Sequence, residues 1–193
     1  MDPSTHAFAE SREATTYTML QRVLQNHCTT HALSLLAALT AAVLLLVGMC
    51  LQLCEAGGVE EGTFLRQTLA GLKQRVRTRP ARVPLHLLAE PDDVDPQDPR
   101  VRPQTEALSR ALATLLGEAA EAHQLSPEGR WRIARALVAD LLGLWLPPGD
   151  GPRGAMDAVM AQLGRAMAAQ LTRARGQTVP APPGRFGAGA QEA

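Results

Sequence analysis

One long run of apolar residues dominates the hydrophobic pattern of the chain. Residues 32–53 carry no charged side chain, and their polar side chains are those of Ser34, Thr40 and Gln52. As a helix this run is about 33 Å long, which matches a bilayer hydrocarbon core of about 30 Å. A helix in a soluble domain normally keeps a polar face. The run therefore predicts a transmembrane helix over residues 32–54.

Two alternatives to a membrane anchor remain for this run. A cleaved signal peptide has a short basic leader and an apolar core of roughly 7–15 residues, whereas here the run is longer and residues 1–31 precede it. The other alternative is a buried central helix, which a domain of this size could hardly surround. We interpret the run as an uncleaved signal-anchor of a single-pass protein.

The charges beside the run indicate its orientation only weakly. Arg22 lies upstream, and the nearest charges downstream are acidic, beginning with Glu55. Because positive flanks favour the cytoplasmic side, we expect the N-terminal segment 1–31 to be cytoplasmic and the C-terminal domain extracytoplasmic. The basic residues that follow residue 72 are the main evidence against this orientation.

Residues 59–79 predict an amphipathic juxtamembrane helix. Its apolar side chains recur at helical spacing, and basic side chains gather toward its C-terminal end, where they complement the helix dipole. The same side chains form a candidate patch for anionic lipid or for an acidic partner. The patch consists of Lys73, Arg75, Arg77, Arg79 and Arg82.

Residues 80–102 and 176–193 interrupt the helical pattern. The first segment is rich in proline and acidic residues, from Glu90 to Asp98, and it predicts a stiffened linker. The second is rich in proline and glycine and predicts a disordered tail. These segments enclose a predicted helical domain at residues 103–175.

The domain at 103–175 has the clearest periodicity in the chain. Ser126 followed by Pro127 is a strong helix start signal. Short connections between amphipathic helices are typical of a small antiparallel bundle. Three amphipathic helices are predicted, over 103–125, 126–146 and 151–175.

The middle helix of this domain has apolar side chains around much of its circumference. Such a helix suits either the centre of a bundle or a protein interface. Our candidate interaction residues on it are Trp131, Leu142 and Trp145. Asp140 falls beside the apolar face, where we expect an edge position. The alternative is a pair with an arginine of a neighbouring helix.

Composition narrows the classes of function. Aromatic residues make up 3% of the chain, which favours helices over strands, and the formal net charge is zero, which argues against general nucleic-acid binding. The sequence contains no nucleophile–base motif, phosphate-binding glycine loop or metal-ligand spacing. We expect no enzymatic activity, no cofactor and no metal.

All three cysteines, Cys28, Cys50 and Cys54, lie in or just before the apolar run. Cys50 and Cys54 are one helical turn apart and, with Gly48, form a narrow surface suited to helix–helix contact. The alternative for these two cysteines is lipidation.

The predicted fold is all-α, a single transmembrane helix followed by a bundle of three to four amphipathic helices. We expect a non-enzymatic membrane-anchored assembly or scaffold protein, of the kind found in bacterial envelope, secretion or conjugation complexes. Its expected partners are the lipid bilayer and a protein partner or a second copy of the chain. The alternative is a viral or eukaryotic membrane protein whose basic segment and helical domain act at the cytoplasmic membrane face.

Overall fold

The structure is a computed structural model that describes residues 3–57, 60–78, 98–145 and 153–177. These segments are helical and contain no strand, so the predicted all-helical class is confirmed for them. The helices are α1 (Pro3–His31), α2 (Leu35–Gly57), α3 (Glu61–Thr78), α4 (Arg102–His123), α5 (Pro127–Trp145) and α6 (Arg153–Gln177).

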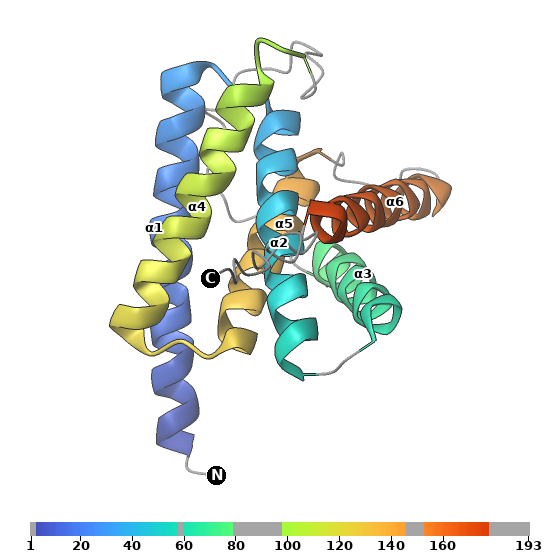
Figure 1. Cartoon of the computed structure of the whole chain (residues 1–193). Coiled ribbons are helices and arrows are strands. Elements are labelled where there is room, and N and C mark those ends of the chain that lie inside the picture. The colour runs from blue at the N-terminus through green and yellow to red at the C-terminus, as the bar shows by residue number, and fades with distance from the viewer. Residues whose placement is uncertain (1–2, 58–59, 79–97, 146–152, 178–193) are drawn as a thin grey trace, which may run out of the picture.

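The six helices lie in three pairs (Figure 1). Helices α1 and α4 are side by side at one side of the molecule, α2 and α5 pack together in the middle, and α3 and α6 lie together at the other side. Helix α2 also contacts α3, α4 and α6. The apolar helix is thus placed among the other helices, and it shares one hydrophobic core with them.

The junction between α1 and α2 explains where the apolar helix begins. Ala32 adopts a left-handed conformation (φ 51°), and the Leu33 N–H donates to the Cys28 carbonyl at 3.0 Å, which closes α1. The Ser34 hydroxyl then accepts from the Ala37 N–H at 3.2 Å and caps α2. Ser34 is therefore the N-cap of α2, and the apolar helix begins directly after it.

The junction between α4 and α5 is built in the same way. Gln124 has φ 52°, and the Leu125 N–H donates to the Ala120 carbonyl at 3.0 Å. The Ser126 hydroxyl accepts from the Gly129 N–H at 3.0 Å. The helix start predicted at Ser126 and Pro127 is confirmed.

The helical stripes read from the sequence point into the core. In α4 the buried apolar side chains are Leu108, Leu112, Leu116 and Ala119. In α6 they are Met160, Leu163, Met167 and Leu171. In α5 every residue from Ala136 to Leu142 is buried, which places this helix at the centre of the molecule.

Candidate functional site

Helix α2 is the feature that carries the strongest functional signal. It contains one stretch long and apolar enough to cross a membrane, Leu35–Glu55, with a mean hydropathy of 2.3. The core helix of a soluble protein and a signal sequence share this length and composition, and 61% of the apolar window is buried inside this structure. Length and composition alone therefore do not distinguish a membrane-spanning α2 from a buried core helix or a signal sequence.

Small side chains allow the neighbouring helices to approach α2 closely. Ala37, Ala38, Ala41 and Ala42 have no exposed surface, and neither has Leu46 one turn further on. An alanine projects only a methyl group, so helices packed on it can approach at short distance. We expected that so small a domain could hardly surround a buried helix; in this structure α3, α4, α5 and α6 all contact it.

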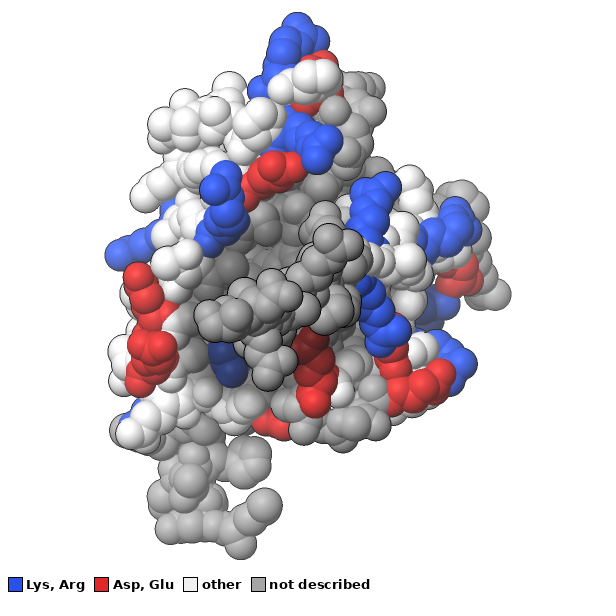
Figure 2. Space-filling model, viewed as in Figure 1, with Lys and Arg blue, Asp and Glu red and all other residues white. Residues whose placement is uncertain are grey.

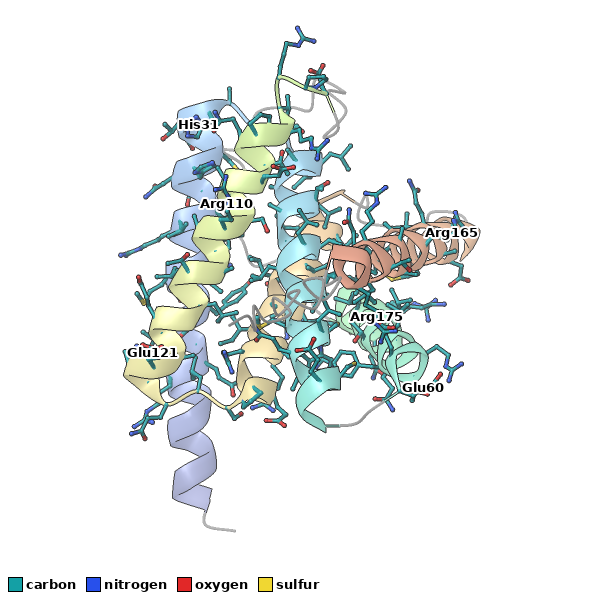
Figure 3. The ribbon with its side chains drawn as sticks, in the orientation of Figure 1. His31, Glu60, Arg110, Glu121, Arg165 and Arg175 are labelled. Carbon is teal, nitrogen blue, oxygen red and sulfur yellow. The ribbon has the colours of Figure 1, made fainter. Side chains whose placement is uncertain are left out.

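The helices around α2 present charged side chains to their surroundings. Helix α4 packs on α2 and carries exposed charges along its length, among them Arg110 and Glu121 (Figure 3). Met19, at 39%, is the one large hydrophobic side chain exposed among the described residues. A charge at the centre of a bilayer costs about 2.5–3.5 kcal/mol. This packing and a bilayer-spanning position of α2 therefore exclude each other.

A buried polar junction holds three of these helices together. Asp140 on α5 is 8% exposed and accepts a hydrogen bond from the hydroxyl of Tyr17 on α1. Its other carboxylate oxygen lies 3.8 Å from Nε of Arg75 on α3. Gln21 donates to the Tyr17 hydroxyl at 2.9 Å. The edge position that we expected for Asp140 is therefore wrong, and the alternative, a pair with an arginine of a neighbouring helix, is present with Arg75.

The junction changes the chemistry of Tyr17. Burial, the hydrogen bond to Asp140 and the negative charge of Asp140 all raise the pKa of the Tyr17 phenol above its ordinary value. The phenol therefore stays protonated and keeps donating to the carboxylate. The Asp140 carboxylate accepts from this neutral phenol and pairs with Arg75, so these contacts serve to hold α1, α3 and α5 together.

A second cluster surrounds Trp131. The Arg135 guanidinium lies 4.3 Å from the centre of the Trp131 ring, and the Phe64 ring of α3 lies 5.5 Å from it on centroid distance. Burial, together with the charges of Arg75 and Arg132, lowers the pKa of Arg135. These contacts attach α3 to α5, so in this structure Trp131 serves packing within the chain.

The other two candidate interaction residues differ from Trp131 in position. Leu142 is 1% exposed and lies in the core, so its side chain reaches no partner in this arrangement. The side chain of Trp145 lies outside the described residues. Of the two members of the set whose side chains are described, Leu142 is buried and Trp131 is partly buried.

The structure divides the predicted basic patch. Lys73 forms an ion pair with Asp157 of α6, and Arg75 pairs with Asp140 as described above. Arg77 is exposed. Arg79 and Arg82 lie outside the described residues. Two members of the patch thus connect α3 to its neighbours, and one faces outward.

The cysteines and Gly48 fit the packing interpretation only in part. Cys50 is 1% exposed and Cys28 is 2% exposed, whereas Cys54 is partly exposed. A Cβ built on Gly48 meets no atom within 4 Å. Cys50 thus behaves as a small buried hydrophobe, while Gly48 makes no close helix–helix contact in this structure.

The described residues contain no group of three or more metal-ligating side chains. Comparisons with known proteins supply no further assignment. The chain matches no protein-family model, and it shows no significant similarity to a curated protein or to a solved structure.

Proposed function

We propose that this protein is a non-enzymatic, single-pass membrane-anchored assembly protein, with α2 as the anchor and α3–α6 as the helices that contact partners. The proposal is carried by one observation, the uniformly apolar character of α2 amid helices with charged outer faces. The arrangement described above is its membrane-free form, in which the amphipathic helices cover the anchor.

Transfer of α2 into a bilayer exchanges one apolar environment for another. Lipid tails are as apolar as leucine side chains, so the buried alanines and leucines of α2 lose little hydrophobic stabilisation. Thr40, in its second turn, already donates to the Leu36 carbonyl at 2.8 Å, so its hydroxyl needs no water. Ser34 and Glu55 lie at the two ends, where headgroups and water remain accessible.

The helices that α2 leaves behind then need a new partner. The apolar faces of α4, α5 and α6 would be exposed, and large exposed apolar patches mark interaction sites. A second copy of this chain or the helices of another protein can cover them. Assembly on the membrane thereby becomes coupled to insertion of the anchor.

Alkaline extraction of membranes from cells that express the full chain tests the anchor. The informative variant is Leu44→Arg, because Leu44 is only partly buried and a long side chain there can extend to solvent in the folded protein. In a bilayer the same arginine lies near the middle of the span and costs about 2.5–3.5 kcal/mol. Leu115→Arg, at a partly buried leucine of α4, is the matched control.

We expect the unaltered chain and Leu115→Arg to stay in the alkaline membrane pellet and Leu44→Arg to be extracted. Extraction of the unaltered chain would refute the anchor. The assembly role predicts that the protein reconstituted in nanodiscs or detergent associates with itself or a co-purifying partner, and a lone monomer would contradict it. Reporter fusions after Glu60 and at the C-terminus test our proposal that the C-terminal part is extracytoplasmic.

A further inference from the structure

Positive charge is concentrated on one pair of helices. Helices α3 and α6 each carry four Lys or Arg residues against one acidic residue, whereas the other four helices together carry seven basic and eight acidic residues. Figure 2 shows blue side chains over α3 and α6, with red ones beside some of them. A chain with zero net charge therefore has one strongly basic region.

Two ion pairs join α3 and α6 into one surface. Lys73 of α3 pairs with Asp157 of α6, and Glu61 of α3 pairs with Arg175 of α6 at 2.9 Å. Each acidic residue of the two helices is thereby matched by one cation. With four basic residues against one acidic residue on each helix, the surface keeps a net positive charge.

Exposed arginines lie on both helices of this pair, and those of α3 share one side. Arg66 and Arg77 are about three helical turns apart, so they project from the same side of α3, the side from which Lys73 reaches α6. Arg165 and Arg173 occupy exposed positions on α6, and Arg165 lies far along this helix from Arg175 (Figure 3). We call the surface formed by Arg66, Arg77, Arg165 and Arg173 the α3–α6 basic surface.

We infer that the α3–α6 basic surface binds the headgroups of anionic phospholipids and positions α2 for insertion. Helix α3 begins four residues after α2 ends, so the surface adjoins one end of the candidate span. A basic segment beside a span is attracted to anionic lipid with a strength of about 1 kcal/mol per Lys or Arg. This inference rests on the proposed membrane role and adds its lipid class.

Sedimentation with vesicles tests this surface on the full chain. The test variant changes Arg66, Arg77, Arg165 and Arg173 to Gln together. The control variant changes Arg22, Arg100, Arg102 and Arg110 to Gln; these four are also exposed but belong to α1, α4 and the turn before α4. Both variants lose the same charge, so any difference between them reports the location of the charge.

With vesicles of equimolar phosphatidylcholine and phosphatidylglycerol at low salt, the test variant should bind at least about tenfold more weakly than the unaltered chain. The control variant should bind as the unaltered chain does, and added salt should remove most of the difference. Equal losses in both variants, or none in either, would overturn the inference.

Two further arms separate this inference from its alternatives. Vesicles of phosphatidylcholine alone carry no net charge. The unaltered chain and both variants should therefore sediment with them equally weakly. Binding to polyglutamate as strong as binding to the anionic vesicles would instead assign the surface to an acidic protein and overturn the lipid assignment. Failure here leaves the alkaline extraction of Leu44→Arg unaffected, so the anchor and the lipid surface fail separately.

Discussion

Helices α2 and α5 lie together in the middle of the molecule, yet only α2 is suited to a bilayer. Both are buried along much of their length. Helix α5 places Asp140 and Arg135 among its buried or partly buried side chains, and it holds them through Tyr17, Arg75 and Trp131. Helix α2 contains no charged residue between Leu35 and Cys54.

Equal burial therefore does not mean equal chemistry. Asp140 of α5 finds its partners, Tyr17 and Arg75, on neighbouring helices, so α5 depends on the folded chain. In α2 the Thr40 hydroxyl bonds within its own helix, and Ser34 and Glu55 lie at the two ends, so α2 can exchange its neighbours for lipid. Whether a helix can enter a bilayer depends on where its polar groups find hydrogen-bond partners. The buried fraction of its surface does not distinguish α2 from α5.

The largest expected effect tests whether the two helices share one core. Leu46 in α2 and Leu141 in α5 are both fully buried. Leu46→Ala and Leu141→Ala should each lower the free energy of unfolding by about 2–5 kcal/mol, measured by urea denaturation without detergent. An unchanged stability for Leu46→Ala alone would place α2 outside the core and break the comparison.

The next effect concerns the polar groups that distinguish the helices. Asp140→Ala leaves Tyr17 and Arg75 without their shared carboxylate and should cost about 3 kcal/mol. Thr40→Val in α2 removes a hydroxyl that bonds only within its own helix, and it should cost less than about 1 kcal/mol. Urea denaturation measures the loss of unfolding free energy for both variants. Similar losses would contradict the proposed difference between the polar groups of α2 and α5.

A pH titration reports the junction directly, because Tyr17 is the chain's only tyrosine. Burial, then Asp140, raises the pKa of Tyr17 in the folded protein, while the unfolded value is about 10. The stability that neutral Tyr17 contributes is therefore complete below about pH 10 and is lost as pH rises further. Phenolate absorbance should appear near pH 10 only in the urea-unfolded chain; the same midpoint in the folded protein would contradict the buried contact.

The smallest effect tests the helix–helix contact predicted at Gly48. A Cβ at Gly48 of α2 or at Gly117 of α4 meets no atom within 4 Å. Gly48→Ala and Gly117→Ala should each raise stability by about 0.5–1 kcal/mol, because alanine is the better helix former. A gain at Gly117 with a loss at Gly48 would show that Gly48 makes a close contact absent from this structure.

The sequence predicted where helices form better than it predicted which helices pack against one another. Helix periodicity and the Ser126 cap depend on residues a few positions apart, so both were readable along the chain. The cover over α2 was missed because it is assembled from α3, α4, α5 and α6, which lie far apart along the chain, and each contributes one amphipathic face. The division of the basic patch was also unreadable, because Asp157 and Asp140 reach Lys73 and Arg75 only through tertiary packing.

The most direct test of the central claim is the depth of α2 in a bilayer. A chain whose three native cysteines are changed to Ala receives one environment-sensitive fluorophore, through Leu44→Cys on α2 or Leu115→Cys on α4. With anionic vesicles that contain bromolipids, the account predicts strong quenching of the label at position 44 and little at position 115. Equal quenching at both positions, or none at position 44, would contradict the claim that α2 alone enters the membrane.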